Sequence, residues 1–76
     1  MFEATPNPNA IKLEIKHDLE VGREYSELNE DTPELIKKIL NIEGIFSVFV
    51  GPTFLTLIKN QEDDWKDLVR TVEQVL

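Results

Sequence analysis

Carboxylate side chains carry the most obvious chemistry in this sequence, because they gather in two short stretches around predicted helix starts. The first stretch contains Glu27, Glu30, Asp31 and Glu34, and the second contains Glu62, Asp63, Asp64 and Asp67. Carboxylate oxygens ligate hard cations such as Ca²⁺, Mg²⁺ and iron. Neither stretch has EF-hand spacing, and helix capping with a solvated acidic face explains the same residues without a metal. The candidate ligands for a weakly bound iron are Glu30, Asp31, Glu62, Asp63 and Asp64.

No other set of residues is typical of a catalytic site. His17 and Asp18 form an adjacent pair suited to general base chemistry, but no nucleophile motif lies near them. Ser26 and Ser47 lack a nucleophile elbow, and the three glycines are too scattered for a phosphate-binding loop. The chain has no Cys, which excludes disulfides, thiol catalysis and thiolate ligation of an iron–sulfur cluster. We therefore predict a protein that is not an enzyme and has no cofactor of its own apart from the candidate iron.

Two phenylalanines in one apolar run suggest a surface for a protein partner. Side chains alternate along a strand, so Phe46 and Phe49 are expected on opposite faces unless a bulge intervenes. One ring then joins the core, and the other is exposed in a partner-docking surface together with the turn at Gly51 and Pro52. The alternative is that the N-terminal segment covers the second face of the sheet. Trp65 begins the apolar stripe of the last helix, and we expect it to be largely buried.

Length and charge limit the class of protein. The chain has 76 residues, enough for one small domain spanning residues 1–76. Its 15 acidic and 8 basic side chains give a net charge of −7, which disfavours nucleic acid and membrane surfaces as partners. The first residues lack the features of a signal peptide, and no apolar run is long enough to span a membrane. Together with the lack of Cys, these features favour a cytoplasmic protein.

Hydrophobic periodicity predicts the strands and helices that position these residues. The expected strands are an optional one at 2–5 and four others at 11–16, 23–28, 45–50 and 53–59. The first helix is expected to start at Thr32 and Pro33 and to end at Asn41 or Gly44. The second helix is expected to run from Trp65, with Asp63 or Asp64 as its cap. Short turns between strands favour an antiparallel sheet, and two amphipathic helices need a face to cover. We therefore predict an α+β fold, an antiparallel sheet of four or five strands with two helices packed on one face, in the order (β)ββαββα.

Proline and glycine mark the turns. Pro6, Asn7, Pro8 and Asn9 form a stiff turn, since each Pro fixes its own φ and Asn side chains bond to nearby backbone groups. We interpret this turn as structural first and as a recognition surface second. Gly51 is expected at positive φ in a type II′ turn that joins two strands as a hairpin, and Gly44 is expected to permit the turn after the first helix.

Three segments resemble a known family. They are TPNPNAIKLEI (Thr5–Ile15), IEGIFSVFVGPTFLTLIKN (Ile42–Asn60) and DDWKDL (Asp63–Leu68). In this order they resemble the N-terminal domain of Nfu/NifU-like iron–sulfur cluster scaffold proteins. The resemblance implies an α+β domain and a link to iron–sulfur cluster assembly or delivery. It also implies an association with iron, which it assigns to no residue of this sequence.

Three functional hypotheses follow. The first is a non-catalytic accessory or protein-interaction domain whose partners are iron–sulfur assembly components. In complete members of the family a separate C-terminal domain with a Cys-x-x-Cys motif binds the cluster, so this Cys-free chain does not inherit that activity. The second is an iron-binding protein that uses carboxylates alone. The third is a general protein-docking module unrelated to clusters.

Overall fold

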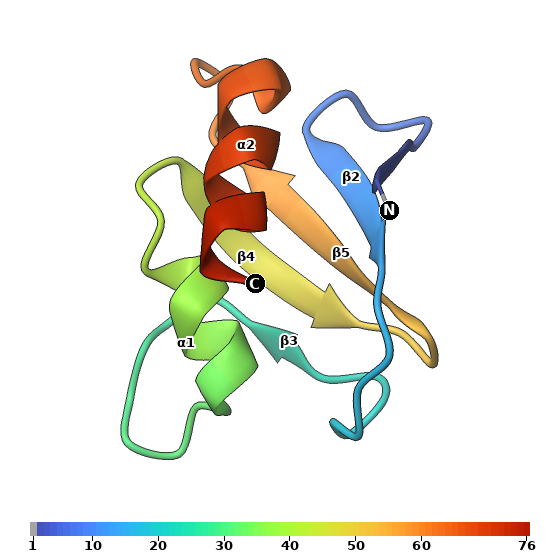
Figure 1. The fold of residues 1–76 in the computed structure, drawn as a ribbon, viewed down its shortest axis with the longest axis vertical. Helices are drawn as coiled ribbons and strands as arrows, with labels where there is room; N and C mark the ends of the chain where they lie inside the picture. The colour runs from blue at the N-terminus through green and yellow to red at the C-terminus, as the bar shows by residue number, and fades with distance from the viewer. Residues whose placement is uncertain (1) are drawn as a thin grey trace.

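The structure, a computed structural model, describes residues 2–76 as one antiparallel sheet with two helices on one of its faces (Figure 1). The elements are β1 (Phe2–Ala4), β2 (Ala10–Glu14), β3 (Glu24–Tyr25), α1 (Glu34–Leu40), β4 (Ile45–Val50), β5 (Phe54–Lys59) and α2 (Trp65–Val75). The strands lie in the order β1-β2-β5-β4-β3, and every neighbouring pair is antiparallel. The predicted α+β class and element order are confirmed, with β1 as the fifth strand.

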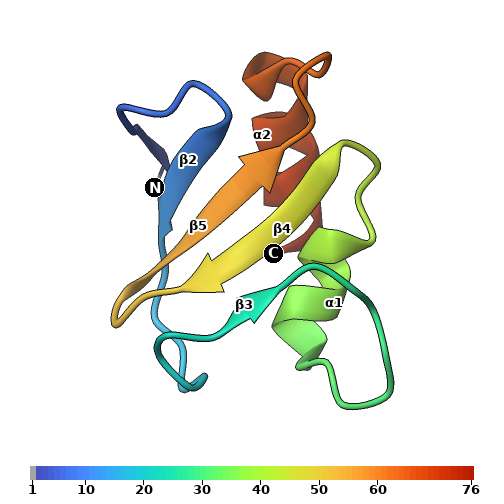
Figure 2. The same ribbon diagram turned by 180° about the vertical axis from the view of Figure 1, so that it is seen from behind.

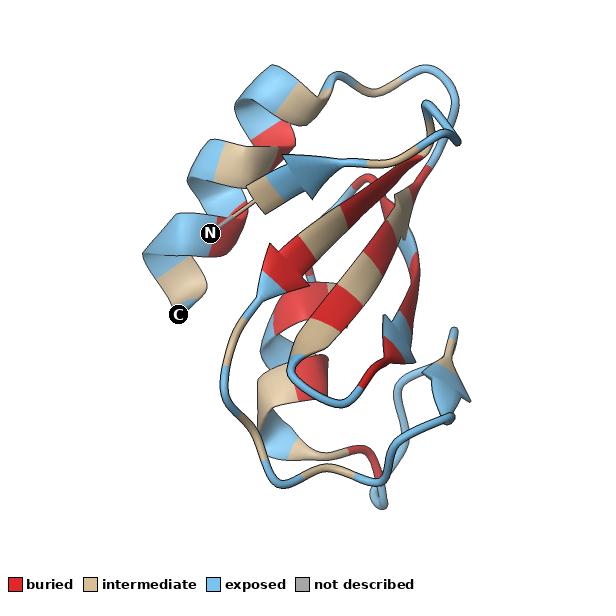
Figure 3. Ribbon diagram, turned by 90° about the vertical axis from the view of Figure 1, so that its right-hand side faces the viewer, coloured by how far each residue is buried: buried red, intermediate tan, exposed pale blue. Residues whose placement is uncertain are grey.

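The core lies between the sheet and the helices. Ile11 and Leu13 of β2 stand opposite Leu57 and Leu55 of β5, and all four side chains are buried. Along the strands the buried positions alternate with more exposed ones (Figure 3), as period two requires when one face is covered. The helices contribute Ile36 and Ile39 from α1 and Leu68 and Val72 from α2. Among residues 2–76, no helix is both long enough and apolar enough to cross a bilayer.

A β-bulge in β4 changes the predicted placement of the two phenylalanines. Ile45 pairs with Lys59 and Ser47 pairs with Ile58, so Phe46 is an extra residue in this strand. Because the bulge inserts one extra residue, the alternation of side chains between the two faces shifts by one position within β4. As a result Phe46 and Phe49 are both exposed, by 60% and 39%. The prediction that one ring joins the core is therefore wrong. Val48 and Val50 fill that role instead.

Three local predictions at turns and helix ends are also corrected. The helix α1 begins one residue later than predicted, with Pro33 rather than Thr32 as its N-cap. Buried Thr32 instead accepts a hydrogen bond from the Asn29 N–H (3.0 Å) within the preceding loop. Gly51 joins the predicted hairpin, but positive φ values occur at Gly22 and Gly44 and not at Gly51. Trp65 packs against the core but is only half-buried.

The start of α2 agrees with the sequence. Asp64 caps the helix, since its carboxylate accepts a hydrogen bond from the Lys66 N–H at 3.0 Å. Gly44 has φ of 106°, as expected for the turn after α1, and a Cβ there would lie 3.0 Å from the Leu68 side chain. The backbone N–H of Asn60 donates to Gly44 O (2.9 Å), which ties this turn to the loop before α2.

Candidate protein-interaction surface

The sheet has one face that the helices leave uncovered, seen in front in Figure 2. The pairing register assigns to this open face the side chains of Glu3, Ala10, Lys12, Glu14, Glu24, Ser47, Phe49, Phe54, Thr56 and Ile58. Phe46 of the bulge stands next to Ser47, opposite Ile58. A bare sheet face that carries phenylalanine rings is typical of a surface that contacts another protein.

Phe46 and Phe49, which we call the aromatic pair, are the most exposed aromatic side chains of the open face. Glu24 of β3 stands directly opposite Phe49, and its carboxylate accepts a hydrogen bond from the Ser47 hydroxyl at 3.4 Å. On the other side of the face, Lys12 Nζ lies 4.7 Å from the centre of the Phe54 ring. The open face thus has an acidic side chain beside the aromatic pair, and on its β1 and β2 side it has Lys12 together with Glu3 and Glu14.

The hairpin turn at Gly51 and Pro52 presents one of its two residues to solvent. Pro52 is exposed, whereas Gly51 is buried, and a Cβ at Gly51 would overlap the Phe54 ring. The carbonyl of Gly51 accepts a hydrogen bond from His17 Nε2 at 2.7 Å, while His17 Nδ1 accepts from the Leu19 N–H at 3.0 Å. His17 therefore links the connection formed by residues 15–22 to the hairpin turn, and these two hydrogen bonds give its imidazole a structural role.

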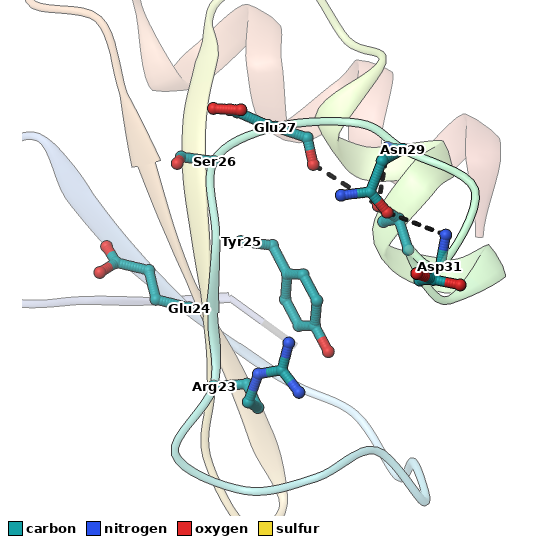
Figure 4. Close-up of a pocket in the computed structure, with 8 residues that line it drawn as sticks. Arg23, Glu24, Tyr25, Ser26, Glu27, Asn29 and Asp31 are labelled. Atoms are coloured by element: carbon teal, nitrogen blue, oxygen red, sulfur yellow. Dashed lines mark hydrogen bonds between the residues drawn. The ribbon is translucent and has the colours of Figure 1, made fainter.

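A shallow polar pocket of about 310 Å³ lies beside the edge strand β3 (Figure 4). Tyr25 points into it, with Arg23 stacked 5.3 Å from its ring centre and bonded to Glu20 at 3.3 Å. The far wall is the loop held by Asn29, whose side-chain oxygen accepts from the Asp31 N–H at 2.8 Å. Sequence reasoning missed this pocket because residues 16–31 form no motif and the pocket arises from a loop folding back on the strand.

The Pro-Asn-Pro-Asn turn is held by residues from the other end of the chain. Lys59 Nζ donates to Asn9 Oδ1 (3.1 Å), the Lys59 N–H donates to Asn9 O (2.9 Å), and Trp65 Nε1 donates to Pro8 O (3.1 Å). Thr5 closes the turn internally, because its hydroxyl donates to Ala10 O at 3.0 Å. The three segments that carry the family resemblance therefore meet at one corner, where their shared role is structural.

The candidate iron ligands lie in two different loops. Glu30 and Asp31 precede α1, and Glu62, Asp63 and Asp64 precede α2, where Asp64 is already the helix cap. Within residues 2–76, no three His, Cys, Asp or Glu side chains lie close enough together to hold a metal ion. Iron binding by these carboxylates stays a prediction.

Comparison with protein families and relatives identifies one family. The profile described as "Scaffold protein Nfu/NifU N terminal" matches residues 1–76. "Conserved virulence factor C" of Staphylococcus aureus (strain MRSA252) is 32% identical over 74 residues, which cover 95% of this chain and 20% of that protein. YpgR of Bacillus subtilis (strain 168) is 34% identical over 74 residues, covering 93% and 20%. This chain therefore spans about one fifth of the length of these relatives.

Two solved structures share the fold. The crystal structure of protein SAV1430 from Staphylococcus aureus superposes with a TM-score of 0.91 at 27% identity, over 99% of this chain and 93% of that one. The solution structure of SeR13 from Staphylococcus epidermidis gives a TM-score of 0.67 at 26% identity, over 97% and 88%. The sheet and helix arrangement of this chain is thus similar to that of experimentally determined proteins.

Proposed function

Because the chain belongs to the family of Nfu/NifU scaffold-protein N-terminal domains, we propose that it is a non-catalytic protein-interaction domain serving iron–sulfur cluster assembly or delivery. The single observation that carries the proposal is the family match over residues 1–76. The chain has no Cys, so in this proposal the thiolate ligands of the cluster belong to partner proteins in the cytoplasm. The chain's own task is to hold such a partner.

The open face supports the interaction role. It carries Phe46 and Phe49 with 60% and 39% exposure, on a domain whose core is already filled by other side chains. Exposed aromatic rings promote association and are enriched where proteins bind one another. The partner-docking surface of the proposal is therefore the aromatic pair with the neighbouring Pro52.

A reconstitution with purified components tests the proposal. A cysteine desulfurase, a cluster scaffold and an apo-ferredoxin are mixed with and without this chain, and cluster transfer to the ferredoxin is followed by circular dichroism. We expect the wild-type chain to bind at least one component and to change the transfer rate. The double variant F46S/F49S is expected to lose both effects while it stays folded.

The matched control replaces a solvent-exposed residue away from the open face, Glu73→Gln in α2, and should behave as wild type. A chain that binds none of the three components and leaves the transfer rate unchanged would contradict the proposal. Binding to a protein outside this pathway, with no effect on transfer, would instead favour a general docking module.

A further inference from the structure

We propose that the aromatic pair, together with Glu24 and Glu27, binds an amphipathic helix whose apolar stripe is flanked by Lys or Arg. This inference rests on the proposed protein-interaction function and specifies the chemistry of the partner. The helix lies on the open face, its apolar side chains contact Phe46 and Phe49, and its basic side chains reach the carboxylates at the β3 edge.

Packing favours a helix as the occupant. The opposite face of the same sheet is covered by two helices, α1 and α2 (Figures 1 and 2). Each helix contributes buried apolar side chains to the core against the strands. A layer of helix on sheet is one of the few stable ways to cover a sheet face. A third helix on the open face would repeat that arrangement, with Phe46 and Phe49 at the contact.

Charge favours a basic flank. Glu24 stands opposite Phe49 in the sheet, and Figure 4 shows its side chain pointing away from Tyr25 and therefore away from the helices. In the same view the Glu27 carboxylate turns to the same side of the chain as Glu24. Neither carboxylate takes part in an ion pair within residues 2–76. Glu24 therefore places a negative charge beside the aromatic pair, and Glu27 adds a second one three residues further along the chain.

The nearby cations do not neutralise these two charges. Arg23 is engaged elsewhere, since it forms an ion pair with Glu20 at 3.3 Å and its guanidinium lies 5.3 Å from the centre of the Tyr25 ring. Lys12 lies over the Phe54 ring, on the β2 side of the open face. The open face thus carries Glu24 beside the aromatic pair and Glu3 and Glu14 on the same side as Lys12, so acidic side chains outnumber basic ones on it and a basic helix suits this face.

A peptide titration tests this chemistry directly. The ¹⁵N-labelled chain is titrated with two synthetic helical peptides of about 18 residues, long enough to form helix on a surface. Both peptides have the same Leu stripe, and one carries Lys and the other Glu on its flanks. We expect the Lys peptide to shift the amide signals of Phe46, Phe49 and Glu24, and to bind about tenfold more tightly than the Glu peptide.

Variants separate the patch from the net charge of the molecule. E24Q/E27Q is expected to weaken the Lys peptide about tenfold, and F46S/F49S to abolish the localised shifts. E62Q/D63N, which removes two charges from the other acidic stretch, should leave the dissociation constant within about twofold. Thermal unfolding of each variant establishes that it is folded.

Each remaining outcome overturns the inference. Equal weakening by E62Q/D63N and E24Q/E27Q would mean that the peptide follows net charge alone. Equal binding of the Lys and Glu peptides would refute the role of the two carboxylates. If the NMR signals of the bound peptide showed no helix and the amide shifts of the protein followed the β3 edge, the peptide would be binding as an added strand instead. The titration contains no iron–sulfur protein, so its failure is distinct from failure of the reconstitution experiment.

Discussion

Lys59 is a buried cation that neutral oxygen atoms satisfy. Its side chain is 9% exposed, and the ammonium donates to Asn9 Oδ1 at 3.1 Å and to Asn60 O at 3.3 Å. A hydrogen bond to a charged group is stronger than one between neutral groups, and a buried donor without its partner is costly. The Asn9 side chain therefore satisfies the buried Lys59 ammonium, in addition to the backbone bond between the Lys59 N–H and Asn9 O.

Asn9→Ala removes this acceptor and should destabilise the protein. We expect the free energy of unfolding to fall by about 1.5–3 kcal/mol. Urea unfolding followed by the fluorescence of Trp65, the single tryptophan, measures the change. Asn60→Ala is the matched control, because Asn60 bonds to Lys59 through its backbone carbonyl and keeps that contact. Equal losses in the two variants would contradict the role assigned to the Asn9 side chain.

Gly51 is required for space and not for its backbone angle. Its φ is not positive, but a Cβ would overlap the Phe54 ring. We expect Gly51→Ala to cost about 1–3 kcal/mol of stability, the usual range for overpacking. Replacing Phe54 by Leu in the same chain should restore part of the loss, since it clears the space. A G51A variant as stable as wild type in calorimetry would show that the ring moves aside freely.

Among the elements, β4 has the feature that sequence reasoning could least foresee. The order of strands and helices could be predicted, because apolar residues recur with period two in β2 and with helical spacing in α2. The bulge at Phe46 could not, because it depends on how β4 pairs with β5, and the run Ile45–Val50 is apolar at every position except Ser47. The docking role of Phe46 and Phe49 stays a prediction, and the expectation that one of the two rings joins the core is wrong because of this bulge.

The bulge changes what substitutions in β4 should do. Phe46→Ser and Phe49→Ser are each expected to change the free energy of unfolding by about 1 kcal/mol or less, since both rings lie at the surface. Leu57→Ala, at a site with no solvent exposure, should cost about 2–5 kcal/mol. Chemical denaturation of the three variants provides the comparison. A loss at Phe46 or Phe49 as large as that at Leu57 would mean that the ring belongs to the core.

At the scale of the whole molecule, the net negative charge disfavours the compact folded state. Fifteen acidic and eight basic side chains share a chain of 76 residues, and like charges repel one another when it folds. Raising NaCl from about 0.01 M to about 0.1 M shortens the Debye length from about 30 Å to about 10 Å. We expect the urea midpoint to rise, with a gain in stability of about 1 kcal/mol.

Two variants check the origin of this salt effect. E62Q/D63N removes two negative charges and makes the net charge less negative, so the stability of this variant should respond less to NaCl than that of wild type. Asn60→Ala leaves the charge unchanged and should respond as wild type does. A midpoint that falls as NaCl rises would mean that attractive pairs outweigh the repulsion.

Because β5 lies in the centre of the sheet but near the end of the sequence, the complete sheet can form only late during synthesis. β2 pairs with β5, so Ala10 finds its neighbour Ile58 only after 48 further residues have been synthesised. Until then β1 and β2 have only each other, and a lone two-stranded hairpin is marginal in water. The nascent chain therefore emerges with its first strands unsupported, and the sheet closes in one late step as β5 inserts between β2 and β4.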